Sequence, residues 1–144
     1  MQVTGILTMK GTTVATIAST ATVAEAAEAL RVNRCGALVV SSTGDTVDGI
    51  VSERDIVRQL AAKGANVLMS TVADVMTREV ATCGPTDTVE QLMALMTERR
   101  IRHVPVVTDG RLKGIVSIGD VVKHRVSQLE DENRTLYSYV TGSH

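Results

Sequence analysis

The sequence predicts a mixed α/β fold of the α+β kind, built from two βαββα repeats packed sheet to sheet about a pseudo-twofold axis. Three observations predict it. The chain has 144 residues and is 44% hydrophobic, which suits one compact domain or two small ones sharing a core. The stretch GIVSERDIVRQL at 49–60 returns as GIVSIGDVVKHR at 114–125. Other parts of the chain repeat at nearly the same spacing, which indicates two copies of one structural unit.

The repeat can be followed along most of the chain. Val14-Ala15-Thr16 recurs as Val80-Ala81-Thr82, an offset of 66 residues. Beyond the next turn the offset falls to 65, because Gly49 pairs with Gly114. Insertions and deletions are tolerated in turns, so this change of offset supports the alignment of the two copies.

Each copy opens with a short extended V-A-T segment and continues with an amphipathic helix. Thr22-x-x-Glu25 and Thr88-x-x-Gln91 match the capping box, in which two side chains satisfy the free amides of a helix start. Behind each box, apolar residues recur at i, i+3, i+4 and i+7, beginning at Val23 in the first copy and at Val89 in the second.

Two short strands and a second helix complete each copy. The apolar runs at 37–40 and 104–107 are followed by a turn rich in Gly and Asp. A second run, G-I-V in both copies, leads directly into a helix at the motif S-x-x-D. The order in each copy is therefore strand, helix, strand, strand, helix.

These elements divide the chain into a first repeat at 8–62, a linker at 63–75, a second repeat at 76–126 and a helical tail at 127–144. The linker carries apolar residues, so we expect it to be docked and partly helical. The sequence of the tail predicts a polar helix, with Leu129, Leu136 and Val140 toward one side and two tyrosines nearby. A solvated terminal helix and a contact with a dimer mate or a partner both fit this pattern.

Composition excludes several classes of function. The net charge is −1 and aromatic residues are almost absent, so we expect no nucleic-acid partner. No window approaches the roughly 18 apolar residues that a membrane span needs, and the start does not resemble a signal peptide, so we expect a cytoplasmic protein without membrane contact. The two cysteines lack C-x-x-C spacing and are interpreted as buried or incidental thiols. No catalytic or metal-binding motif is present, so we expect no enzyme, no metal and no catalytic cofactor.

The paired G-h-h-S-x-x-D motifs, together with RIRHVPVV at 100–107, resemble a pair of cystathionine-β-synthase (CBS) domains, the Bateman module. More narrowly, the chain is similar to bacterial stand-alone CBS-pair proteins. The resemblance implies two clefts between the repeats and an adenosyl ligand: AMP, ADP, ATP, NAD(H) or S-adenosylmethionine. It also implies a homodimer in the form of a four-repeat disc, and it leaves room for an unidentified protein target.

The S-x-x-D motif has two interpretations. Ser52 with Asp55, and Ser117 with Asp120, can cap a helix, which stabilises it by about 1 kcal/mol. A helix N-terminus also binds anions, and a carboxylate one turn in can accept bonds from a ribose diol. In the family that the chain resembles, the Asp holds the ribose and the Ser lies near the phosphates, which favours a nucleotide site at both motifs.

Basic residues make the two expected clefts unequal. The family pattern implies that Arg102 and His103 reach a phosphate chain, whereas Arg99 is interpreted as a surface residue. The first copy has no charge at the matching positions. Its Arg54 can point toward a phosphate, and the pseudo-twofold would let it serve the cleft of Asp120. The second motif is therefore expected to be the occupied one.

The remaining candidate residues concern the base. No aromatic side chain is available for stacking, so the base must lie between aliphatic side chains, Ile17, Ile101 and Ile118 being the candidates. The resemblance adds the threonines of the two V-A-T segments, Thr16 and Thr82, and four residues acting through backbone and shape, namely Gly36, Ala37, Val104 and Pro105.

The sequence thus leaves three functions to compare. The first is a regulatory module that binds an adenine nucleotide and signals through a conformational or dimer change. The second is a module for S-adenosylmethionine. The third is a structural dimerisation module without a ligand, in which both S-x-x-D motifs are only helix caps.

Overall fold

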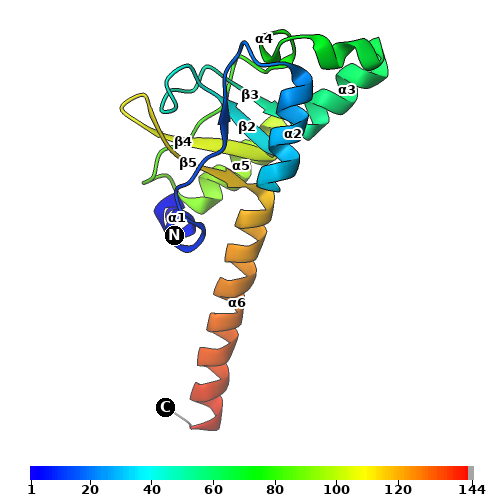
Figure 1. Cartoon of the computed structure of the whole chain (residues 1–144). Coiled ribbons are helices and arrows are strands. Elements are labelled where there is room, and N and C mark those ends of the chain that lie inside the picture. The colour runs from blue at the N-terminus through cyan, green and yellow to red at the C-terminus, as the bar shows by residue number, and fades with distance from the viewer. Residues whose placement is uncertain (143–144) are drawn as a thin grey trace.

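The first repeat forms a three-stranded sheet with two helices (Figure 1). The computed structural model describes residues 1–142. The elements of this repeat are β1 (Thr16–Ile17), α2 (Val23–Asn33), β2 (Ala37–Val40), β3 (Gly49–Ser52) and α3 (Glu53–Lys63). Strand β2 lies in the middle, parallel to β1 and antiparallel to β3. All four residues of β2 are buried, as its continuous apolar run predicts.

The second repeat has the same order with one difference. Its elements are α5 (Val89–Arg99), β4 (His103–Thr108), β5 (Arg111–Ser117) and α6 (Ile118–Thr141). Strands β4 and β5 are antiparallel. In place of a first strand, Cys83 makes a single parallel bridge to Val106. Two small sheets with helices, in the predicted order, confirm the α+β fold.

The predicted helix caps are present, with one exception. Full capping boxes stand at Thr88 with Gln91, and at the serine and aspartate of both S-x-x-D motifs. Thr22 accepts a hydrogen bond from the Glu25 amide at 3.1 Å, but the Glu25 side chain does not bond back. The first of the four boxes is therefore only half formed.

Two helices outside the expected units tie the repeats together. Helix α1 (Val3–Lys10), which the sequence did not predict, buries Val3, Ile6 and Leu7 in the core of the second repeat. The segment between the repeats is docked and partly helical, with the 3₁₀ helix η1 (Ala65–Met69) and the short α4 (Val72–Val75), both packed in the core of the first repeat. Each core is thus completed by a helix that precedes the other repeat in sequence.

This exchange explains the glycine that begins both G-I-V runs. A Cβ atom at Gly114 would stand 2.7 Å from Cδ2 of Leu7, and one at Gly49 would stand 2.6 Å from Sδ of Met76. Both distances are shorter than van der Waals contact. The close approach of Leu7, in α1, and of Met76, just after α4, therefore favours the smallest residue at each of the two positions.

Replacing Gly114 with Ala should lower the free energy of unfolding by about 1–3 kcal/mol, because the added methyl group overlaps Leu7. Urea denaturation of the wild type and the variant measures the loss. In the Leu7→Ala/Gly114→Ala double variant the removed side chain makes room for the methyl group, so the combined loss should be smaller than the sum of the single losses. Additive losses would contradict the overlap.

The C-terminal tail is not a separate element. Helix α6 begins at the second S-x-x-D motif and continues to Thr141 as one helix of 24 residues. Its second half extends away from the body of the molecule (Figure 1). Among the described residues, no helix combines the length and the apolar character that crossing a bilayer requires.

Candidate functional site

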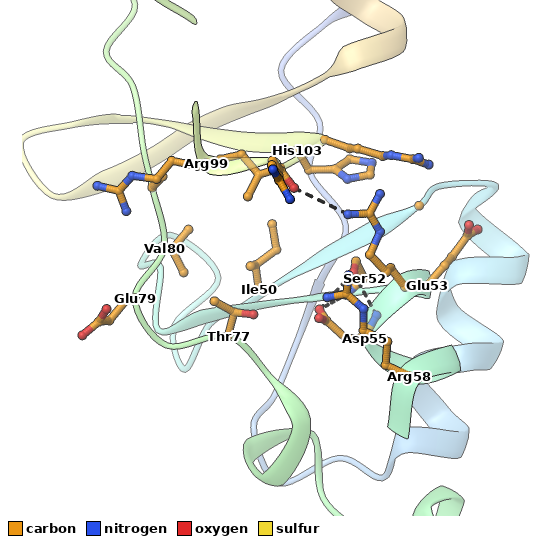
Figure 2. Close-up of a pocket in the computed structure, with 16 residues that line it drawn as sticks. Ile50, Ser52, Glu53, Asp55, Arg58, Thr77, Glu79, Val80, Arg99 and His103 are labelled. Carbon is orange, nitrogen blue, oxygen red and sulfur yellow. Dashed lines mark hydrogen bonds between the residues drawn. The ribbon is translucent and has the colours of Figure 1, made fainter. Parts of the chain in front are cut away.

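A pocket with a volume of about 370 Å³ lies between the start of α3 and the connection from α5 to β4 (Figure 2). Thr77, Glu79, Val80 and Ala81, at the start of the second repeat, also contribute to its lining. Seven residues expected at a site line it: Gly36, Ser52, Arg54, Asp55, Ile101, Arg102 and His103. The pocket is therefore built from both repeats, around the first S-x-x-D motif.

Asp55 is held in place by the cap of α3. Its Oδ2 accepts hydrogen bonds from the Ser52 amide and from the Ser52 hydroxyl, each at 2.9 Å. The Asp55 amide donates to the Ser52 hydroxyl oxygen at 3.2 Å. Within the described part of the chain, the second carboxylate oxygen, Oδ1, makes no hydrogen bond. One oxygen of an oriented carboxylate is thus left for a ligand (Figure 2).

Five arginines give the pocket its charge. Arg99, Arg100 and Arg102 come from the α5–β4 connection, and Arg54 and Arg58 come from α3, whereas only three carboxylates line the same space. Arg54 donates a long hydrogen bond of 3.5 Å to the Arg100 carbonyl oxygen, so the two walls touch. A concave surface with an excess of guanidinium groups attracts anions, and it suits phosphate in particular.

Arg99 was interpreted from the sequence as a surface residue, and its side chain is exposed. It also lines the pocket, on the same side as Glu79 (Figure 2). The basic run at the end of α5 was the available signal, since all of Arg99, Arg100 and Arg102 reach the pocket.

His103 lies on the wall opposite Asp55 and is half-buried (Figure 2). Burial, and then the positive charge of Lys10, hold the pKa of His103 below its usual value, against the pull of the Glu53 and Asp120 carboxylates. A Cβ atom at Gly36 would stand 3.0 Å from Cε1 and Nε2 of the imidazole. The absence of a side chain at Gly36 therefore makes room for the imidazole of His103. The lowered pKa favours the neutral form of this imidazole.

The pocket also has an apolar part, lined by Ile50, Val80, Ala81 and Ile101. Ile50 and Val80 lie on the same side of the pocket as Thr77, Glu79 and Arg99 (Figure 2). Ile101 was expected to contact a base, and it lies in the lining. The V-A-T segment contributes its Val and Ala to the pocket instead of the expected Thr82, which is exposed. The V-A-T segment was thus expected at the pocket and does border it, through residues other than Thr82.

Several expected residues do not line this pocket: Thr16, Ile17, Ala37, Thr82, Val104, Pro105, Ser117, Ile118 and Asp120. Three of them, at the starts of β2 and β4, are buried within their strands, whereas Ile118 is exposed on the first turn of α6. Residues that line the pocket without having been singled out are Ile50, Glu53, Arg58, Thr77, Glu79, Val80, Ala81 and Arg100. No group of three or more His, Cys, Asp or Glu residues in the described chain is placed to hold a metal ion.

Asp120, the counterpart of Asp55, is paired within the chain. Lys10 Nζ donates to Asp120 Oδ2 at 2.5 Å and to the Ile115 carbonyl oxygen at 2.9 Å. The Ser117 amide donates to the same carboxylate oxygen at 2.8 Å. Burial raises the pKa of Asp120, but the bonds from Lys10 and Ser117 outweigh it and hold this pKa below its usual value. No ion pair of this kind involves Asp55 among the described residues.

The structure therefore groups the charged residues differently from the sequence interpretation. Arg102 and His103 were expected to support Asp120, and Arg54 was expected to reach the same cleft. All three line the pocket of Asp55, although His103 also lies close enough to Asp120 and Lys10 for their charges to act on it. The second motif, expected to be the occupied one, has a lysine against its carboxylate. In this pocket the first repeat supplies the S-x-x-D motif and the second repeat supplies Arg102 and His103. The sequence interpretation had placed these two basic residues beside the motif of their own repeat.

Replacing Lys10 with Met should lower the free energy of unfolding by about 1 kcal/mol at neutral pH, because Asp120 loses a partly buried ion pair. Since the folded pKa of Asp120 lies below its ordinary 3.8, the stabilisation is present above that pH. It disappears as the pH falls through the folded pKa. Denaturation curves of the two proteins should converge in acid, and a difference that persists at pH 2 would contradict this origin.

The family model for the CBS domain matches residues 11–62 and 72–127. The chain is 40% identical over 113 residues to the CBS domain-containing protein CBSX3, mitochondrial, of Arabidopsis thaliana, covering 76% of this chain and 55% of that protein. It is 32% identical over 116 residues to the CBS domain-containing protein YhcV of Bacillus subtilis, covering 81% of each. The chain thus spans about half of the plant relative and most of the bacterial one.

Solved structures agree with the family. The CBS-domain containing protein ATU1752 from Agrobacterium tumefaciens superimposes with a TM-score of 0.83 at 45% identity, covering 86% of this chain and 92% of that one. PAE2072 from Pyrobaculum aerophilum, complexed with AMP, gives 0.77 at 30% identity, with 90% and 97% covered. The CBS domain pair of MJ0100, in complex with 5-methylthioadenosine and S-adenosyl-L-methionine, gives 0.79 at 27% identity, with 89% and 98% covered. With both of its repeats matched, this chain belongs to the CBS-domain family.

Proposed function

We propose that the chain is a regulatory module that binds an adenine nucleotide, either AMP, ADP, ATP or NAD(H), in the pocket of Asp55. One observation carries the proposal: an oriented carboxylate with a free oxygen faces a wall of arginines across a pocket of about 370 Å³. Such a volume lies in the range of small-molecule sites. The structural relatives that hold AMP or S-adenosylmethionine support an adenosyl ligand.

Each part of such a ligand has a matching surface in the pocket. Asp55 Oδ1 is available to the ribose diol. The arginines suit the phosphates. The apolar lining residues Ile50, Val80 and Ile101 suit the adenine ring, which needs shape and dispersion contacts where no aromatic residue is present.

The charge of the pocket favours nucleotides over S-adenosylmethionine. That molecule carries a sulfonium and an ammonium group against one carboxylate, so its net charge is positive. Five arginines against three carboxylates repel a cation and attract a phosphate chain. S-adenosylmethionine remains the second candidate because the MJ0100 domain pair holds it.

Regulation follows from the position of the pocket. A ligand there contacts α3 of the first repeat and residues 99–103 of the second, so it holds the two repeats in one arrangement. Ligand binding shifts a conformational equilibrium only by its difference in affinity for the two states. A nucleotide that bridges both repeats has such a difference whenever they can move relative to each other.

Calorimetric titration tests the proposal. AMP, ADP, ATP, NAD, NADH, adenosine and S-adenosylmethionine are titrated in turn into the wild-type protein. We expect the phosphate-bearing ligands to bind at one site per chain, and adenosine to bind about tenfold more weakly, because it lacks the charge-assisted bonds to arginine. Tighter binding of S-adenosylmethionine would select the second candidate. If none of these ligands binds, the structural dimerisation module without a ligand is the function that remains.

The neutral state of His103 predicts a pH dependence of binding. A phosphate group beside the imidazole should raise its lowered pKa, so that binding takes up a proton. Affinity for ADP should therefore rise as the pH falls from 8 toward 6, and it should rise less in His103→Gln. Comparison with the variant removes the titration of the phosphate itself. Parallel pH profiles for the two proteins would show that His103 is not coupled to the ligand.

A further inference from the structure

Helix α6 carries an apolar stripe whose side chains are about half exposed or more. The stripe consists of Val122, Val126, Leu129, Leu136 and Val140, whose exposed fractions lie between 49% and 76%. The spacing alternates between four and three residues, with Asn133 occupying the one position between Leu129 and Leu136 that is not apolar. A spacing of this kind places all six side chains along one face of a helix, as in a coiled-coil seam.

The stripe faces away from the rest of the molecule. On the other side of α6, Val121 and His124 are buried against the body. Gln128, Asp131 and Thr135 continue that side and line a cavity shared with Met1 and Met9. The buried residues of α6 thus lie on one side of the helix and most of the stripe lies on the opposite side, although Leu136 reaches the edge of the same cavity.

We propose that α6 forms a parallel two-stranded coiled coil with α6 of a second copy of this chain. In the heptad abcdefg, Val126 and Val140 take position a, and Leu129 and Leu136 take position d. Branched residues at a with Leu at d favour two parallel strands, and a single Asn at a fixes the register and the number of strands. Asn133 holds that position here and would face Asn133 of the second copy.

Charge complementarity supports both the second copy and the parallel direction. In a parallel pair, the residue at position g lies beside the residue five places later, at position e, of the other helix. These residues are Arg125 and Glu130, of opposite charge, so two attractive pairs form by symmetry. Within its own chain Arg125 bonds only to the Gln128 side chain, at 3.0 Å, and Glu130 has no hydrogen bond or ion pair among the described residues.

This interface goes beyond the proposed nucleotide site, because none of its residues lines the pocket of Asp55. It also differs from the four-repeat disc expected from the family resemblance. The two could combine, in which case the wild type would be larger than a dimer. The coiled coil itself is tested by whether the mass depends on the stripe of α6.

Sedimentation equilibrium of three full-length proteins at about 10–100 μM tests the proposal, because the dimer fraction rises with protein concentration. The chain mass is 15.3 kDa. Leu129→Asp should halve the mass of the wild-type assembly, because it places a charge in the seam. Arg134→Asp, a larger change of charge off the stripe, should leave the mass unchanged. An unchanged mass in Leu129→Asp, or a monomeric wild type, would overturn the proposal.

A charge exchange and a cross-link test the register even if Leu129→Asp folds poorly. Arg125→Glu and Glu130→Arg should each raise the dissociation constant about fivefold, and the double variant should restore it. Leu136→Cys should give a disulfide-linked dimer on mild oxidation, with the wild type, which keeps Cys35 and Cys83, as the control. Failure of the double variant to restore association, or no cross-link at residue 136, would overturn the parallel pairing.

Discussion

Replacing Asp55 with Asn should weaken the binding of ADP or ATP by about tenfold to a hundredfold, the usual cost of losing a hydrogen bond to a charged group. The carboxylate is the acceptor that a ribose diol requires, and its free oxygen Oδ1 faces the pocket. Asn keeps the shape, and its carbonyl can still accept from the Ser52 amide, so the cap of α3 is preserved. The dissociation constants come from calorimetric titration of the two proteins.

The same substitution at Asp120 is the matched control. Asp120 stands at the equivalent position of the second motif, but Lys10 already occupies its side chain. Asp120→Asn should change nucleotide affinity by no more than about twofold while lowering stability, because Lys10 loses its ion-pair partner. Equal losses of affinity in the two variants, or a larger loss at Asp120, would show that the second motif holds the ligand.

Replacing Arg100 with Asn should weaken the binding of ATP by about tenfold and leave adenosine binding unchanged, because the guanidinium acts on phosphate alone. Arg100 ends α5 in the left-handed conformation, with φ 54°. Asn tolerates that conformation better than most residues, so the backbone is not disturbed. Titration with ATP and with adenosine separates loss of the phosphate contact from loss of the site.

Arg34 provides the control for this prediction. It ends α2 in the same conformation, with φ 50°, and is the repeat counterpart of Arg100, but it does not line the pocket. Arg34→Asn should therefore leave the affinity for ATP unchanged. If Arg34→Asn weakened ATP binding as much as Arg100→Asn, both arginines would contribute to phosphate binding. The proposal that only the pocket of Asp55 binds the nucleotide would then be wrong.

Local signals predicted most of the fold. The capping boxes and the alternation of apolar runs with turns depend on residues close together in sequence, so the helices and strands of both repeats could be placed. Helix α1 was missed, because the partner of its apolar face is the core of the second repeat, about a hundred residues away. The first repeat has the strand β1, whereas at the equivalent place in the second repeat Cys83 makes only a single bridge to Val106. The two V-A-T segments are similar in sequence, so no pattern in them predicts this difference.

The site was predicted by residue more successfully than by grouping. The motif residues Ser52 and Asp55, and the basic residues Arg102 and His103, do meet in one pocket. Their grouping was misassigned because it depends on how the repeats cross. Lys10 reaches Asp120 across 110 positions of sequence, and no local pattern marks such a contact.

The amide spectrum of the ¹⁵N-labelled protein, recorded by NMR while ADP is added to saturation, tests most directly whether an adenine nucleotide occupies the pocket of Asp55. We predict that the largest shifts fall on the first turn of α3, on Thr77 and on Ile101, and that the amides of Ser117 and Asp120 move little. Shifts centred on Ser117, Asp120 and Lys10 instead, or no saturable shift at all, would contradict the account.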